Sequence, residues 1–229
     1  MYSFRIVRDI YRDAWNWWDA CNKASFGVDW KSSVSDPIVA QIIGKTQEEA
    51  DQLLLPFLDN KYKQEEAKIQ KFIADTTEYF NDNFQIACTK MVKVMGHPLY
   101  RTDFTFIITT FPRSPYNKNK GYIWICPDRP DPLHVFLHEL CHFQFIHYWR
   151  EDPKSPVAKL SNDAFEYLKE SLTIILDQNF VPPMQRPDRG YIVHQEFRKE
   201  LTAQWTKNHD FDQLVKFGTE RVVSYCPKD

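Results

Sequence analysis

The run His138-Glu139-Leu140-Cys141-His142 has residue types and a spacing that can do chemistry. Two histidines four positions apart share one face of a helix, with Cβ atoms roughly 5–6 Å apart, so both rings can reach one metal ion. The glutamate beside the first histidine can act as a general base there. This is the arrangement of a zinc hydrolase, which needs a third protein ligand and keeps one position open.

The residues around this run predict that the helix carrying it is central and buried. Apolar side chains surround it on nearly every side, namely Val135, Phe136, Leu137, Leu140, Phe143, Phe145, Ile146 and Trp149. Because burying a polar or charged group without a partner is costly, a metal ion is the simplest partner for the two histidines and the glutamate. The alternative is that both histidines are core residues hydrogen-bonded to backbone or carboxylate groups.

The third ligand is expected to be a carboxylate on a second helix. His147 follows His142 by five residues, so its side chain points away from the two ligand histidines. The later glycine and histidine that complete the metzincin motif are absent. A catalytic zinc ion with three protein ligands therefore requires a donor from elsewhere in the chain.

A histidine-glutamate-x-x-histidine motif followed by a glutamate on a later helix resembles the gluzincin clan of zinc metallopeptidases. The small members of that clan, the minigluzincins, keep a two-helix core and a layer of strands. The resemblance covers roughly residues 101–200 and lies in the motif and the order of elements. It implies that His138 and His142 bind one catalytic Zn²⁺ ion, that Glu139 is the general base, and that the substrate is a peptide or protein.

Two glutamates can supply the third ligand that the resemblance implies. Glu170 is followed by Ser171, as the ligand glutamate of the clan is followed by a small residue that lets the two metal-bearing helices approach closely. Glu166 has a carboxylate four residues later, an offset at which several clan members brace a ligand histidine. We favour Glu170 and keep Glu166 as the alternative.

A donor for the oxyanion of the reaction would complete such a site. Clan members commonly use a tyrosine or a histidine that follows the third ligand in the chain. Tyr191 and His194 lie there, three positions apart on one face of a predicted helix, and either is a candidate.

Two other functions fit the same residues. One is a catalytically inactive zincin-fold module that binds a peptide or protein, against which the intact Glu139 argues. The other is a structural zinc protein, in which a fourth protein ligand takes the place of water. Cys126, Cys141 or His134 would be the place to look for that ligand.

Composition narrows the class of protein. The net charge of -2 predicts neither nucleic-acid nor anionic-membrane binding. No apolar run approaches the ~20 residues that span a bilayer, and the N-terminus lacks the apolar core of a signal peptide. The cysteines are odd in number and scattered, without a Cys-x-x-Cys pair, which favours a reducing compartment. We therefore expect a cytoplasmic protein, and the sequence does not indicate its oligomeric state.

Periodicity predicts an α+β, mainly α fold. The resemblance implies a zincin-like core, in which the motif helix and the glutamate helix pack on a small sheet. The short polar connection between the two predicted strands makes this sheet antiparallel, and an N-terminal helical region precedes it. The corresponding domains are residues 1–97 and 98–229, and the alternative is one continuous domain. Helices are expected over 4–20 and from Thr46 through Phe57, and one or two more between Asp59 and about Met95. Further helices are expected over 162–179, 190–207 and 210–221, and strands over 104–109 and 121–126.

Overall fold

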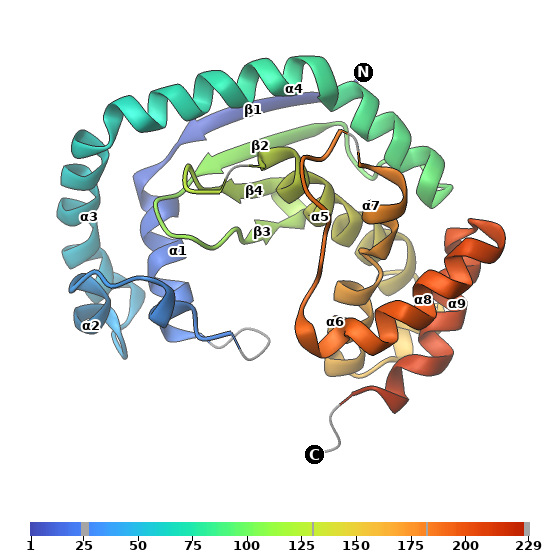
Figure 1. Cartoon of the computed structure of the whole chain (residues 1–229). Helices are drawn as coiled ribbons and strands as arrows, with labels where there is room; N and C mark the ends of the chain where they lie inside the picture. Colours follow the sequence, from blue (N-terminus) through green and yellow to red (C-terminus); the bar gives the residue numbers. More distant parts are fainter. Residues whose placement is uncertain (24–27, 130, 182, 227–229) are drawn as a thin grey trace. The chain divides into compact units, whose positions relative to one another are not determined.

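The computed structural model describes residues 1–23, 28–129, 131–181 and 183–226 (Figure 1). The protein is mainly helical with one four-stranded sheet, which confirms the predicted fold class.

The residues group into two compact units. The first, here called the sheet unit, comprises Ser3–Asn81 and Asp103–Pro132. The second, the helical unit, comprises Met1–Tyr2, Asp82–Thr102 and Leu133–Asp229. As domains, the ranges 1–97 and 98–229 stay predictions, and residues 227–229 of the latter lie outside the described part of the chain.

The sheet is mixed, so the prediction of an antiparallel sheet was wrong. Its strand order is β1-β2-β4-β3, and β1, β2 and β4 run parallel. Within the described residues, only β3 pairs antiparallel, with β4. The strands are β1 (Ser3–Arg8), β2 (Asp103–Ile108), β3 (Tyr116–Asn117) and β4 (Tyr122–Ile125).

The connections explain the parallel pairing. Parallel neighbours need a long crossover, and the chain between β1 and β2 supplies helices for it. These helices are α1 (Ile10–Asn22), α2 (Ile38–Ile42), α3 (Gln47–Gln64) and α4 (Glu66–Met95), the last of which also contributes residues to the helical unit. After β2 the chain runs back along the sheet in β3, and β4 then begins at Tyr122, opposite Thr105 near the start of β2. Strands β2 and β4 are therefore parallel.

The predicted helix over 4–20 was wrong in its first part. Residues 3–8 form β1, which pairs with β2 from Ser3 to Arg8, because strand pairing outweighs a helical spacing of aromatic residues. Helix α1 begins only at Ile10, and Tyr11 is exposed. Asp13 is buried instead and accepts hydrogen bonds from the Thr110 backbone and side chain, which ties α1 to the end of β2.

The helical unit carries the predicted motif helix. Its apolar residues are buried as expected, with Phe136, Leu140 and Phe143 fully inaccessible. No helix in the described part of the chain is both long and apolar enough to cross a membrane. Besides the end of α4, the unit contains α5 (Pro132–Phe145), α6 (Asn162–Ser171), α7 (Ile174–Asn179), α8 (Gln195–Asn208) and α9 (Phe211–Arg221).

The single helix predicted over 162–179 is divided into α6 and α7. The break lies at Leu172 and Thr173, and its cause is competition for one carbonyl group. The backbone oxygen of Glu170 accepts hydrogen bonds from the Thr173 hydroxyl at 2.9 Å and from the Arg198 guanidinium at 3.3 Å. Side-chain bonds of this kind replace the helix ladder and end the helix. The division places Glu170 at the end of α6.

Candidate metal centre

Helix α5 presents His138 and His142 on one face, with ring centroids 4.5 Å apart. The spacing follows from helix geometry, because residues four apart stand one turn above each other. The His142 side chain is nearly inaccessible, whereas that of His138 is 21% exposed. One end of this histidine pair is therefore open to solvent and the other is enclosed by the core.

Glu170 reaches both histidines from the last turn of α6. One of its carboxylate oxygens lies 3.2 Å from His142 Nε2 and the other 3.5 Å from His138 Nε2. One ligand atom from each of the three side chains lies within 4.8 Å of the other two. The fold thus brings two imidazoles from α5 together with one carboxylate from α6.

These distances fit a metal ion with tetrahedral geometry. Ligand atoms at about 2.0–2.1 Å from such an ion are about 3.3 Å apart. The two nitrogen–oxygen distances, 3.2 and 3.5 Å, each go to a different oxygen of the Glu170 carboxylate, and both lie close to that value. The donor set is also the one that zinc peptidases use. The residues present therefore fit a zinc ion.

Glu166, the alternative third ligand, does not join this group. Its carboxylate instead accepts a hydrogen bond from Lys169 Nζ at 2.6 Å. Lys169 is itself buried, and its ammonium lies 3.4 Å from the Glu170 carboxylate. The lysine thus places its ammonium beside Glu170, the candidate ligand, and forms a hydrogen bond with Glu166, the alternative ligand.

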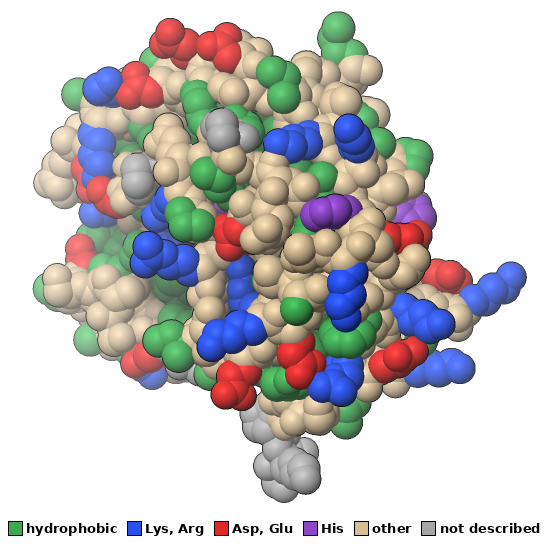
Figure 2. Space-filling view, turned by 45° about the vertical axis from the view of Figure 1, so that its right-hand side comes forward, with side chains coloured by type: hydrophobic (Ala, Val, Ile, Leu, Met, Phe, Trp, Pro, Cys, Tyr) green, Lys and Arg blue, Asp and Glu red, His purple; other side chains and the backbone are tan. Residues whose placement is uncertain are grey.

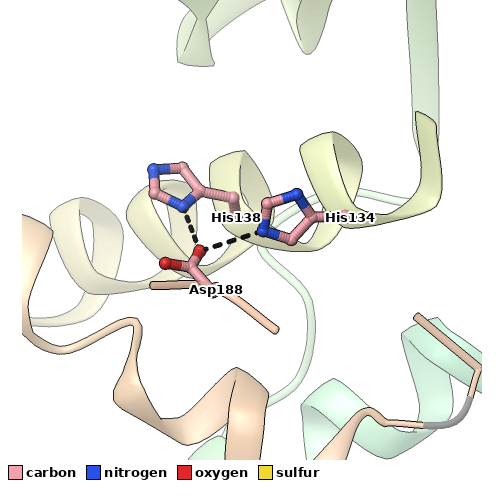
Figure 3. Close-up of side chains that lie close together, drawn as sticks. All are labelled: His134, His138 and Asp188. Atoms are coloured by element: carbon pink, nitrogen blue, oxygen red, sulfur yellow. Dashed lines mark hydrogen bonds and ion pairs between the residues drawn. The ribbon is translucent and has the colours of Figure 1, made fainter. Parts of the chain in front are cut away.

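Asp188 holds the first histidine from the opposite side of its ring. One carboxylate oxygen lies 2.5 Å from His138 Nδ1 and 3.3 Å from His134 Nε2 (Figure 3). His134, His138 and Asp188 can also be grouped as metal ligands. However, 2.5 Å is shorter than the ~3.3 Å that separates two ligands of a tetrahedral ion. The contact with His138 is a hydrogen bond that fixes the ring, so that Nε2 faces Glu170.

Arg198, on α8, fastens the segment that carries Asp188. The guanidinium is buried and donates to the Thr173 hydroxyl at 2.7 Å and to the backbone oxygen of Asp188. Gly190 makes room for it, because a Cβ atom there would lie 2.9 Å from Arg198 Nη1, and its φ of +59° suits glycine. Together with the bond to Glu170, these contacts join α6, α8 and the Asp188 segment around the site.

Charge in the site is distributed unevenly. Burial lowers the pKa of His142 to about 4, which leaves the ring neutral, as a metal ligand must be. Burial alone would raise the pKa of Glu170. His142 and His138 beside it outweigh burial and hold the pKa of that carboxyl well below its usual range. Asp188 overcomes the effect of burial and raises the pKa of His138 well above its usual value.

Glu139 is buried and incompletely paired. It is 8% exposed, and its Oε2 atom has no hydrogen-bond partner among the described residues. Burial raises the pKa of this carboxyl to about 7, against the nearby charge of His138, which lowers it. A buried carboxylate oxygen without a partner is costly, and such groups concentrate where a ligand or a reacting molecule binds.

The two predicted oxyanion donors lie side by side. His194 is 1% exposed, and its Nδ1 atom is buried without a hydrogen-bond partner in the part of the chain that the structure describes. Burial lowers the pKa of His194, while the charge of Glu170 acts to raise it. The Tyr191 ring packs edge-on at 5.6 Å from that of His194. Both precede α8, because the predicted helix over 190–207 begins only at Gln195, after a short 3-10 turn over Ile192–His194.

Sequence reasoning missed three residues of the site, namely Asp188, Lys169 and Arg198. It named His134 only as a possible fourth ligand and not as a neighbour of Asp188. Asp188 lies in a proline-bearing loop two residues before a glycine. Such a context indicates a turn and does not indicate that the carboxylate contacts a ligand histidine. The cysteines proposed as a fourth ligand are not part of either group of possible metal ligands among the described residues. Cys141 is a buried residue of α5.

Replacing Asp188 by asparagine is expected to lower the affinity of the site for Zn²⁺ by about 10- to 100-fold, the usual cost of losing a partner of a ligand histidine. The neutral amide would hold the His138 ring with a weaker hydrogen bond. Competition with a fluorescent zinc chelator measures the affinity. Asp163→Asn, at an exposed position on α6, is the matched control, and equal affinities for the two variants would contradict the role of Asp188.

No protein-family model, no curated protein and no solved structure matches this chain.

Proposed function

We propose that the chain is a zinc-dependent metallopeptidase that hydrolyses peptide bonds in peptide or protein substrates. The observation that carries this proposal is the convergence of His138, His142 and Glu170 at distances that suit a tetrahedral ion. Glu139, adjacent in sequence to the first of these ligands, adds a buried carboxylate oxygen without a hydrogen-bond partner.

The number of ligands favours a catalytic over a structural ion. Structural zinc sites are closed by four protein ligands, whereas catalytic sites keep a position for water or substrate. Within the described residues, the group around Glu170 has three members. The partial exposure of His138 gives a substrate access to this position.

The protein's own groups divide the work of hydrolysis. Bound zinc would polarise the scissile carbonyl and make water a stronger nucleophile at neutral pH. Glu139 Oε2 accepts the proton of the attacking water and passes it to the leaving amine. His194 donates a hydrogen bond to the developing oxyanion, a role for which its buried, unpartnered Nδ1 suits it. Asp188 holds the His138 ring in place throughout.

The cysteines support the predicted cytoplasmic location as part of this proposal. All five are free thiols, and Cys21, Cys88, Cys126 and Cys141 are buried. Free thiols persist in reducing compartments.

Metal removal and restoration test the proposed function. The purified protein is expected to contain one zinc ion per chain by elemental analysis and to cleave members of a peptide library. Dialysis against a chelator should abolish cleavage, and one equivalent of Zn²⁺ should restore it. Bound zinc without cleavage of any peptide would favour a binding module with the zincin fold. A protein that binds no zinc after reconstitution would contradict the proposal.

A further inference from the structure

We propose that a groove beside the candidate metal centre binds a carboxylate of the substrate peptide through Arg189 and Lys199. This inference rests on the proposed peptidase function, and it adds the substrate class, namely peptides that carry a carboxylate at a fixed distance from the bond that is cut.

The groove lies within the helical unit and has a volume of about 790 Å³. The start of α7, the segment after Asp188 and the first half of α8 form its walls. Its apolar lining includes Ile174 and Ile192, and the Ile192 side chain is 90% exposed. An isoleucine left this open to water beside a groove offers a surface on which a peptide can pack.

The charges in the groove leave a surplus of positive charge. The carboxylates of Asp177 and Asp188 are engaged within the protein, by the Asp188 backbone N–H and by His138 respectively, and Arg198 lies 3.6 and 3.7 Å from them. Arg189 and Lys199 are exposed, and no ion pair joins either to a carboxylate among the described residues. A carboxylate is the peptide group that complements these two cations.

The groove and the candidate metal centre share two residues. Asp188 and Arg198 line the groove, and they also contact His138 and the backbone of Glu170. The groove therefore lies next to the residues that hold His138 and Glu170, and a peptide bound in it can extend toward the candidate metal centre. Figure 2 shows basic and acidic side chains interspersed over one face of the molecule, with histidine side chains reaching the surface among them.

A peptide can present a carboxylate from an acidic side chain or from its C-terminus, and a set of substrates separates the two sources. The first series has an amidated C-terminus and one glutamate moved through the positions on each side of the scissile bond. A matched series has glutamine in its place. A third has neutral side chains and a free C-terminal carboxylate at increasing distance from the bond.

The measured quantity is the ratio of kcat/KM for each carboxylate peptide to that for its neutral match. We expect a ratio of about three to ten at one position, as two partly exposed ion pairs give. The ratio should fall toward one in the Arg189→Gln/Lys199→Gln variant. Lys207→Gln/Lys216→Gln makes the same change of net charge at exposed positions outside the groove, and it should keep the ratio.

A binding measurement makes the result independent of turnover. Fluorescence anisotropy of the labelled carboxylate peptide with the Glu139→Gln protein gives the Kd. We expect this Kd to rise about three- to tenfold when Arg189→Gln/Lys199→Gln is added. Added salt should also raise this Kd, because it screens the ion pairs.

Each result decides between the inference and the function on which it rests. Cleavage without a preference for a carboxylate, or a preference that survives Arg189→Gln/Lys199→Gln, would overturn the groove and leave the peptidase proposal standing. Binding that depends on Arg189 and Lys199, in a protein that cleaves no peptide, would support the groove and contradict the peptidase. Loss of the ratio in the groove variant alone supports both.

Discussion

Replacing Glu139 by glutamine is expected to lower the rate of peptide cleavage by about 10²- to 10⁴-fold, which is the range that general acid–base catalysis contributes. Glutamine has nearly the same shape, but its amide cannot accept a proton from water at neutral pH. Glu139 does not belong to the group of His138, His142 and Glu170, so zinc should stay at one ion per chain. Cleavage of the best library peptide and elemental analysis of the same preparation measure the two quantities.

The matched control for this variant is Glu220→Gln, which makes the same chemical change at an exposed position on α9. It should keep both the zinc and the rate. Full activity in the Glu139→Gln protein would remove Glu139 from the mechanism. Loss of zinc together with activity would place the glutamate among the ligands.

The second large effect concerns the choice of the third ligand. Glu170→Gln is expected to weaken zinc binding by about 10²- to 10³-fold, because a site worth about 10–16 kcal/mol shared by three or four ligands loses about 3–4 kcal/mol with one of them. Glu166→Gln, one turn earlier on the same helix, should leave the affinity within about threefold of the parent. Both variants keep side-chain volume, so differences in folding should be small.

Elemental analysis and chelator competition read this pair of variants directly. His142→Ala serves as the positive control, since it removes a ligand on α5. Zinc that survives Glu170→Gln and is lost in Glu166→Gln would mean that the two glutamates exchange roles when the ion binds. Equal, unchanged affinity in all three variants would contradict a zinc site at this place.

Local geometry explains what could be predicted along a single helix. His138 and His142 face the same way because they are four residues apart, whatever the rest of the chain does. The same holds for the capping box at the start of α3, where Thr46 N donates to the Glu49 carboxylate at 2.9 Å and Glu49 N to the Thr46 hydroxyl at 3.3 Å. The burial of α5 also followed from its apolar residues.

Partners from distant parts of the chain required the tertiary structure. Residues 3–8 form a strand because β2, about a hundred residues later, offers a pairing edge. Glu170, and not Glu166, faces the two histidines because of how α6 packs and because Lys169 occupies the other carboxylate. The helix predicted over 162–179 ends at Ser171 because Arg198 and Thr173 take the carbonyl of Glu170.

The spacing of His138 and His142 on one buried helix therefore followed from the sequence by itself, whereas the residues that surround the motif were decided by the tertiary structure. Asp188 illustrates the reason: it lies 50 residues after His138 in a loop without periodicity, and only the folded chain brings its carboxylate to 2.5 Å from the ring. Spacing within a helix is set by a rigid local geometry, and a contact between a helix and a loop is set by the packing of everything between them.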